Sequence, residues 1–406
     1  EIKTSFFYSF FFFVSAEFGE TVWLMYFCQY KREKNNMYLK HLTAINYKNI
    51  SQVELDFSPN VNCFVGANGM GKTNLLDAVY YLSFCKSSLN QSDTFNLKHD
   101  GDFFMLQGDY EDNMKGGLNV CCGLKRGQRK HIKCNGKEYK RFSEHLGKIP
   151  LVLLSPSDSL LVSGGSEERR RFMDIVISQY DKKYLNCIIR YEKALKQRNS
   201  LLKLEEFNSD VLEVLEQMMA TDAQVIYLAR QSFIMEFIPV FRSLYCNLCN
   251  TNVEVADINY ISHCMRGDLL AIWRNERSRE HIVGHTLYGI HKDDLLLTLG
   301  DYPVKREASQ GQSKTFFIAM KLAQFLFLKQ KGTNRTPILL LDDIFDKLDA
   351  GRVGKIVNYV SGDDFGQIFI TDTNKDHLDR ILANSKHEYK LFYVENGIVV
   401  EKHDET

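Results

Sequence analysis

The sequence has no excess of charge of either sign, because lysine and arginine together number 51 and aspartate and glutamate also number 51. A protein that coats DNA uniformly would be strongly basic, so this class is not supported, although a local basic patch is compatible with the balance. The sequence also lacks a long apolar run, since the aromatic stretch Phe6–Val14 is too short to span a bilayer. The 406 residues, of which 44% are hydrophobic and 25% charged, predict a globular protein of two or three lobes.

Paired cysteines are also scarce. The ten cysteines are scattered, and Cys246-Asn-Leu-Cys249 is the one CxxC pair. No second pair of Cys or His lies at the spacing of a zinc finger, although His263 and Cys264 follow. Two readings stay open, a zinc site and reduced thiols, and the scattered pattern favours the reduced thiols of a cytoplasmic protein.

The first 36 residues differ from the rest of the chain. They begin with Glu1, and no basic segment precedes an apolar core as in a secretory signal. Met37 opens a well-patterned strand. We therefore expect residues 1–36 to come from translation upstream of the true start and to lie outside the native fold. A membrane anchor is the alternative, and it would change only the localisation.

Apolar periodicity places strands and helices along the remaining chain. It predicts strands over residues 38–47, 51–57, 61–65, 103–110, 118–124, 131–134 and 151–154, with a helix from Lys72 or Thr73. Asn135-Gly136 between polar strands predicts a hairpin turn. Residues 167–248 have helical spacing, which predicts antiparallel helices in a small bundle or short arm, interrupted near the end by Pro239.

Strand patterns resume beyond residue 281, followed by a helix over 309–331 and a strand over 337–343. This order predicts one α/β lobe built from both ends of the chain, with an α-helical lobe inserted. The expected parts are the extension 1–36, the N-terminal half of the α/β lobe 37–165, the inserted helical lobe 166–282 and the C-terminal half 283–406.

Residues 66–73 read GANGMGKT and satisfy the phosphate-loop pattern G-x4-G-K-[ST] between a predicted strand and a predicted helix. The glycines allow successive backbone N–H groups to point at phosphate oxygens, and the helix N-terminus adds partial positive charge. Lys72 is expected to neutralise the β- and γ-phosphates, and Thr73 to bind Mg²⁺. The alternative is a plain strand-to-helix turn. The expected ATP-binding residues here are Gly66, Ala67, Asn68, Gly69, Met70, Gly71, Lys72 and Thr73.

Two carboxylates end the apolar run PILLLDD. Ligands of parallel sheets bind at the carboxyl ends of the strands. Asp342 is therefore expected beside the Mg²⁺, together with Thr73. Asp343 is expected to act as the general base on the attacking water, and catalysis to depend on Asp343 and Lys72.

The stretch Ser309-Gln-Gly-Gln-Ser-Lys precedes an apolar helix. One reading is a helix start capped by Ser309. The other is a γ-phosphate receptor at a helix N-terminus, formed by Ser309, Gly311 and Gln312. One chain cannot easily wrap both receptors around one nucleotide if they lie on opposite lobes, so a second subunit would supply this one.

In this order, GANGMGKT, SQGQSK, LLLDD and DKLD resemble the nucleotide-binding head of ABC-type ATPases, including the SMC-like DNA-repair branch. Within that branch the chain closely resembles the RecF family. The stretches GGSEERRRFMD and GIHKDD carry this likeness, which runs from Met37 to about Thr373. The expected fold is an ABC-type P-loop ATPase head with a mixed sheet, flanking helices and an inserted α-helical lobe.

The resemblance implies an ATP- and Mg²⁺-dependent homodimer in which the phosphate loop of one subunit and Ser309–Gln312 of the other enclose each ATP. Such a dimer would clamp DNA at single-stranded gaps and ss/ds junctions, and would act with RecR and RecO to load RecA in recombinational repair and replication restart. Slow, DNA-stimulated hydrolysis would release the clamp. Asp349 would contact the opposite subunit.

Two departures from the wider ABC pattern concern the catalytic groups. The strand QIFIT ends in Thr371-Asp372-Thr373 with no histidine, and no glutamine follows LVLLSPSD, so Asp158 and Thr371 or Thr373 are the candidate substitutes. Asp343 also stands where the wider class has a Glu, which would suit slow hydrolysis.

Basic residues give two ambiguous signals. The loop over residues 125–131 is either a phosphate-binding loop or a solvated hairpin, and Arg169–Arg171 either pairs with acids on its own helix or lines the clamp. Two other functions are the alternatives: a subunit that energises a transporter, and a scaffold that binds ATP without hydrolysis. The inserted lobe opposes the first, and the intact Lys72, Asp342 and Asp343 oppose the second.

Overall fold

The computed structural model describes residues 37–90, 92–112, 116–206, 208–249, 255–331, 335–344, 354–356, 359, 365–373 and 388–402. The predicted extension 1–36 and the predicted subunit contact Asp349 lie outside the described residues.

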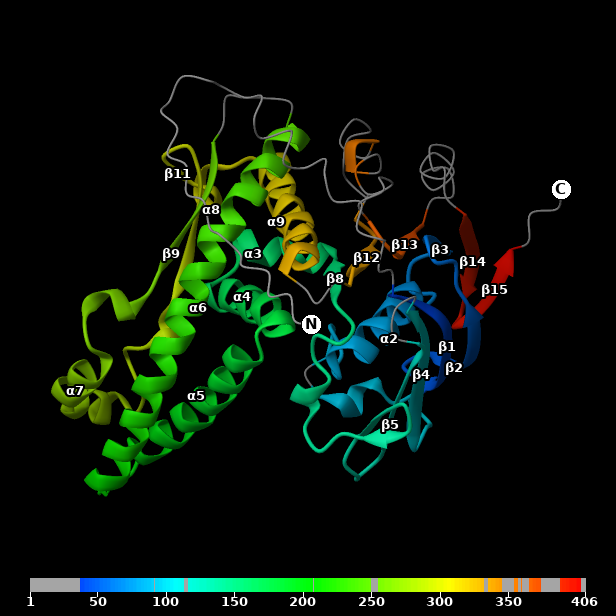
Figure 1. Ribbon diagram of the computed structural model, residues 1–406. Coiled ribbons are helices and arrows are strands. Elements are labelled where there is room, and N and C mark those ends of the chain that lie inside the picture. Colours follow the sequence, from blue (N-terminus) through cyan, green and yellow to red (C-terminus); the bar gives the residue numbers. More distant parts are fainter. Residues whose placement is uncertain are drawn as a thin grey trace, which may run out of the picture. The chain divides into compact units, whose positions relative to one another are not determined.

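An antiparallel sheet takes all its strands from the first hundred described residues and has the strand order β2-β1-β4-β5-β6-β7. Figure 1 labels its strands β1, β2, β4 and β5. Alternate side chains of its strands are buried, and the helix α2 (Lys72–Phe84) packs on that apolar face. The predicted Asn135-Gly136 turn is confirmed, since both residues have positive φ and join β6 to β7. The strands are β1 (Met37–Tyr47), β2 (Ile50–Asp56), β4 (Phe103–Asp112), β5 (Leu118–Lys125), β6 (His131–Cys134) and β7 (Lys137–Glu138).

A second, mixed sheet has the order β15-β14-β3-β13-β12-β8 and takes strands from both ends of the chain (Figure 1). Only the β14–β15 pair is antiparallel among the described pairings of this sheet. Every residue of the three central strands is buried, as in parallel sheets covered on both faces. The predicted α/β class is confirmed. The strands are β3 (Val61–Val65), β8 (Leu151–Leu154), β12 (Ile338–Asp342), β13 (Ile368–Asp372), β14 (Tyr389–Glu395) and β15 (Ile398–Lys402).

Helices fill the middle of the chain, and α5 (Lys182–Leu201) packs along α6 (Ser209–Cys249) (Figure 1). The predicted interruption at Pro239 is wrong, because α6 continues through it. Burial of the neighbouring Phe237 and Phe241 outweighs the one backbone hydrogen bond that a proline removes. The other helices are α3 (Leu160–Ser163), α4 (Ser166–Tyr180), α7 (Leu269–Val283), α8 (Val304–Glu307) and α9 (Gln310–Lys331).

A small antiparallel sheet connects residues on both sides of the predicted boundary at 282. In it β10 (Asp294–Leu299) pairs with β9 (Ala256–Ile261) and with β11 (Tyr302–Pro303). The helix α9 packs against α6, although α9 follows that boundary in sequence. The helical region therefore gains elements from the C-terminal part of the chain through tertiary contacts.

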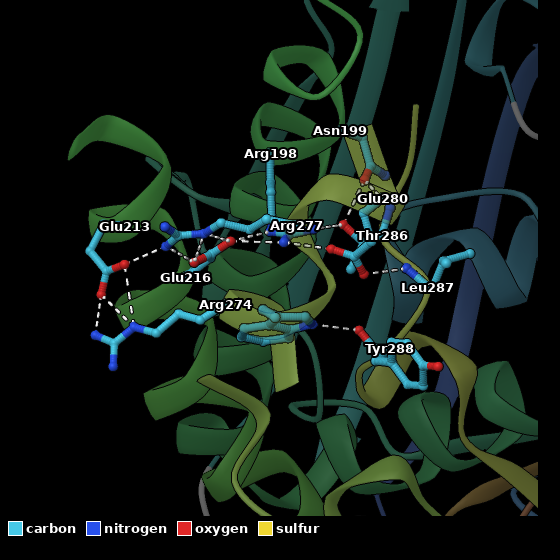
Figure 2. Close-up of polar contacts among 11 residues, drawn as sticks. Arg198, Asn199, Glu213, Glu216, Arg274, Arg277, Glu280, Thr286, Leu287 and Tyr288 are labelled. Atoms are coloured by element: carbon cyan, nitrogen blue, oxygen red, sulfur yellow. Dashed lines mark hydrogen bonds and ion pairs between the residues drawn. The ribbon is translucent and has the colours of Figure 1, made fainter. Parts of the chain in front are cut away.

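A buried arginine joins α5, α6 and α7 (Figure 2). The Arg198 side chain is fully buried and pairs with Glu216 at 2.8 Å and with Glu280 at 2.6 Å. It also donates a 2.7 Å hydrogen bond to Thr286 and lies over the ring of Trp273. Toward the surface, Arg274 and Arg277 pair with the carboxylate of Glu213. This cluster fixes the three helices and the loop after α7 to one another.

Within the part of the chain that the structure describes, no helix combines the length and the apolar character that crossing a membrane requires.

Candidate nucleotide-binding site

The loop between β3 and α2 requires its glycines for local geometric reasons. Gly69 and Gly71 have φ angles of +81° and +113°, a region that side-chain-bearing residues rarely adopt. A Cβ atom at Gly66 would lie 2.3 Å from the carbonyl oxygen of Val394 in β14. The loop therefore curls tightly at the carboxyl end of the mixed sheet, where parallel sheets bind their ligands.

Two turns from distant parts of the chain hold this loop in place. The Met70 carbonyl accepts hydrogen bonds from Asn49 Nδ2 at 3.1 Å and from the Gly397 backbone N–H at 2.9 Å. Asn49 lies between β1 and β2, and its Oδ1 accepts a further bond from Asn74 in α2 at 2.7 Å. Neither Asn49 nor Gly397 belongs to a local motif, so the sequence alone does not predict their contacts with the loop.

Lys72 lies folded over the loop. Its Nζ donates hydrogen bonds to the Gly66 carbonyl at 2.6 Å and to the Ala67 carbonyl at 3.0 Å. Burial lowers the pKa of Lys72, while the charges of Asp343 and Asp342 oppose that shift. A buried ammonium group that only carbonyl dipoles satisfy is well placed to exchange them for phosphate oxygens.

Thr73 and Asp342 meet at the other end of the loop. Thr73 Oγ1 donates a 3.0 Å hydrogen bond to Asp342 Oδ1, and Thr371 Oγ1 of the neighbouring strand donates a second bond to the same oxygen at 2.8 Å. Burial raises the pKa of Asp342, although the two hydroxyl donors lower it. The parallel order β3-β13-β12 brings these residues together, because it ends all three strands at one edge.

This arrangement fits Mg²⁺ by the chemistry of its donors. A hydroxyl oxygen and a carboxylate oxygen in contact are the hard oxygen ligands that Mg²⁺ takes, and this ion keeps several waters beside them. Among the described residues, no group of three or more His, Cys, Asp and Glu side chains gathers as metal ligands.

Asp343 follows in a strained conformation. Its φ is +48°, an uncommon value for a residue other than glycine, and its backbone N–H donates to Thr371 Oγ1 at 3.0 Å. Asp343 lines a hollow of about 150 Å³, and the other lining residues belong to the loop and the start of α2, which are Asn68, Gly69, Gly71, Lys72, Thr73 and Asn74. Part of the predicted phosphate loop and the two residues predicted to act in catalysis, Lys72 and Asp343, thus line one hollow.

A family model described as the RecF/RecN/SMC N terminal domain matches residues 38–400. The DNA replication and repair protein RecF of Phocaeicola vulgatus is 58% identical over 367 residues, which cover 90% of this chain and 99% of that protein. The protein of the same description from Bacteroides fragilis is 55% identical over 366 residues, or 90% and 98% of the two chains. The chain belongs to the RecF family.

Solved structures agree with this family assignment. The recombination mediator protein RecF-ATP in the RecFOR pathway is 28% identical, with a TM-score of 0.83 over 92% of this chain and all of that chain. The corresponding RecF-ATPrS structure has a TM-score of 0.82. The Smc head domain from Pyrococcus furiosus, at 16% identity and a TM-score of 0.54, shows the same fold. The predicted RecF resemblance and head fold are confirmed.

The second predicted phosphate receptor lies at the start of α9, and its side chains are used locally. The Gln312 backbone N–H donates to Ser309 Oγ at 3.2 Å, and the Ser309 backbone N–H donates to Gln312 Oε1 at 2.7 Å. This reciprocal pair is a capping box. Within a single chain, Ser309 therefore acts as the cap of a helix start. Among the described residues, the lining of the hollow includes none of Ser309, Gly311 and Gln312.

The candidate substitutes for the missing histidine and glutamine have different surroundings. Thr371 contacts both Asp342 and Asp343, as described above, whereas Thr373 is exposed. Asp158 caps the turn after β8 by accepting from the Ser155 backbone N–H at 2.8 Å. Asp158 also pairs with Lys321 of α9 at 3.1 Å.

The arginines at the start of α4 do not pair with acids of their own helix. Arg169 is buried and forms a bidentate pair with Asp294 of β10, at 2.6 and 3.0 Å. Arg170 donates to the Asp293 carbonyl at 2.7 Å. Both arginines therefore join α4 to the small sheet, and only Arg171 of the three is exposed.

Proposed function

We propose that this chain is an ATP-dependent DNA-binding homodimer that acts in recombinational DNA repair and replication restart. The observation that carries the proposal is the separation of two halves of a nucleotide site within one chain. Lys72, Thr73 and Asp342 converge on the phosphate loop, whereas Ser309 caps a helix outside the hollow. A second copy that presents the N-terminus of α9 would complete the site.

In the dimer, each residue has a task that follows from its position. Lys72 neutralises phosphate charge, the backbone N–H groups of the loop bind phosphate oxygens, and Thr73 and Asp342 would hold Mg²⁺. A bound Mg²⁺ ion would offset charge on the phosphates. Asp343 accepts a proton from the attacking water as the general base, and Ser309 with Gly311 of the second copy binds the γ-phosphate. Asp349 is proposed to contact the second copy.

Weak, DNA-stimulated hydrolysis would then open the dimer and release DNA. The proposed DNA is gapped duplex or an ss/ds junction, and the proposed partners are RecR, with RecO and RecA. The relatives are described as DNA replication and repair proteins, which supports DNA as the ligand. Lys125, Arg126 and Arg129 form an exposed basic loop that suits phosphate contacts. The cytoplasmic location stays a prediction.

The test measures the size of the protein on gapped duplex DNA with and without ATP and Mg²⁺. We expect a dimer only with ATP, Lys72→Met to prevent both ATP binding and dimerisation, and Ser309→Arg to bind ATP but stay monomeric. Ser200→Arg, at an exposed position of α5, is the matched control and should dimerise normally. ATP-driven dimerisation of Ser309→Arg would refute the shared site. If gapped duplex DNA did not stimulate ATP hydrolysis, the DNA-dependent switch would be refuted.

A further inference from the structure

A second cavity, of about 250 Å³, lies behind the phosphate site. Thr73 and Asp342 line it from the side of the phosphate loop, and Asp158 lines it from the turn after β8. Lys321 and Gln324 line it from α9, the helix that begins with the predicted γ-phosphate receptor. Much of the remaining wall is apolar. The cavity therefore connects the proposed Mg²⁺ ligands with the helix that would meet a second copy.

Gln324 is the unusual residue of this cavity. Its side chain is 1% exposed, and its Oε1 has no hydrogen-bond partner among the described residues. Most buried polar side chains in proteins are hydrogen-bonded, because an unpaired buried amide costs free energy. Lys321, one turn earlier on the same face of α9, is paired with Asp158, so that acid is already engaged. The fold thus holds a buried amide toward a cavity without a protein partner for its oxygen.

The cavity has room for several water molecules, since each occupies about 30 Å³ in the liquid. Water in it would find polar partners in Thr73, Asp342 and the Gln324 amide. The Asp342 carboxylate contacts Thr73 of the phosphate loop, and two hydroxyl groups already orient it. A water molecule hydrogen-bonded to both Gln324 and the Asp342 carboxylate would make the orientation of that carboxylate depend on the position of α9.

We infer that Gln324 is a positioning residue for the ATP site, acting through water in this cavity on the Thr73–Asp342 pair. This inference rests on the proposed function. Gln324 lies about 21 Å along α9 from Gln310, at 1.5 Å per residue, so one rigid helix carries both Gln324 and the end expected to meet the second copy. Docking of that copy and orientation of the Mg²⁺ ligands are thereby coupled through α9.

The test is Gln324→Leu, which keeps a similar side-chain volume and removes the amide. We expect the midpoint of thermal unfolding to stay equal or to rise, because an unpaired buried group is removed. ATP binding in saturating Mg²⁺ should be retained, whereas the Mg²⁺ concentration needed for ATP binding, measured by calorimetry, should rise about tenfold. The hydrolysis rate kcat should fall by a similar factor.

Gln179→Leu is the matched control. Gln179 is also buried, but its amide is used, since Oε1 accepts from the Leu151 backbone N–H at 3.0 Å and Nε2 donates to the Ile175 carbonyl at 3.3 Å. This variant should unfold at a lower temperature and keep the wild-type Mg²⁺ dependence. The two glutamines should therefore show opposite patterns.

Two results would overturn the inference: an unchanged Mg²⁺ dependence in Gln324→Leu, or a loss of thermal stability as large as that of Gln179→Leu. The Mg²⁺ readout requires no turnover or dimerisation. Failure of the proposed function would instead show in the wild-type protein, as absence of an ATP-driven dimer on gapped DNA.

Discussion

At the residue scale, burial disfavours the charged forms of Lys72 and Asp342 in the proposed phosphate site. Burial lowers the pKa of Lys72 and raises the pKa of Asp342, so each charged form is disfavoured without a ligand. Perturbed groups of this kind concentrate at functional sites, where a bound ligand supplies the missing counter-charge. In the proposed function that charge is phosphate for Lys72 and Mg²⁺ for Asp342.

The substitution Asp342→Asn should therefore stabilise the protein in the absence of nucleotide by about 1 kcal/mol at pH 7. The pKa of Asp342 is raised in the folded state, so folding stability is lost as pH rises from its ordinary value of 3.8 through the folded value. Asparagine keeps the acceptor oxygen for Thr73 and Thr371 but carries no charge. Denaturant unfolding at pH 7 and at pH 4 measures the effect.

The advantage of Asp342→Asn should shrink at pH 4, because the raised pKa of Asp342 means that more of the wild-type carboxylate is protonated there than at pH 7. The same variant should lose the Mg²⁺ dependence of ATP binding. A variant less stable than the wild-type protein at pH 7 would contradict the proposed cost of the buried charge.

At the scale of elements, the helical region depends on a few buried polar groups as well as on apolar packing. Arg198 pairs with Glu216 from α6 and Glu280 from α7, and all three side chains are fully buried (Figure 2). Leu287 N–H completes the set by donating to Glu280 Oε1 at 2.7 Å. A buried ion pair adds little net stability, but the removal of one partner leaves an uncompensated charge.

Arg198→Met should accordingly lower the free energy of unfolding by about 3–5 kcal/mol, because Glu216 and Glu280 would lose their shared cation. Chemical denaturation measures this change. Arg274→Met is the control, since the Arg274 side chain is half exposed, its pair with Glu213 is screened by solvent, and the effect should be much smaller. Equal losses in the two variants would show that burial does not distinguish the pairs.

Some elements were predictable to within a residue and others were not. The strands Val61–Val65, His131–Cys134 and Leu151–Leu154 have the predicted ends, because short apolar or alternating runs between turn residues specify a strand locally. The passage of α6 through Pro239 was not predictable in this way. Proline disfavours a helix locally, and only burial of the surrounding aromatic side chains in the tertiary structure offsets it.

At the scale of the whole molecule, two histidines, the buried His145 and the half-buried His291, link the fold to pH. His145 lies between the Leu82 carbonyl at 2.7 Å and the Tyr139 hydroxyl at 3.2 Å. His291 lies between the Tyr191 hydroxyl at 2.9 Å and the Thr286 carbonyl at 3.3 Å. Burial lowers the pKa of His145 to about 4 and that of His291 to about 3. The folded protein therefore holds both rings neutral.

Stability should fall as pH decreases from about 6.5, the ordinary histidine pKa, toward these folded values. In that range the unfolded chain binds protons that the folded protein does not, so each histidine removes up to about 1.4 kcal/mol per pH unit. Unfolding curves between pH 7.5 and pH 5 measure the slope. His145→Gln, which retains a donor for Leu82, should reduce the slope by about half. A flat profile above pH 5 would contradict this account.

The sequence by itself determined the local features of this protein: the glycine loop, the strand before it, the helix after it, and two carboxylates at the end of an apolar strand. Each depends on residues within one turn or one strand, so periodicity and residue type were sufficient. The tertiary structure decided which distant groups meet. The hydroxyl of Thr73 reaches Asp342 across 269 positions of the chain, and Met70 accepts from Asn49 and Gly397. It also left Gln324 facing a cavity. Such contacts follow from sheet order and helix packing, which no short segment encodes.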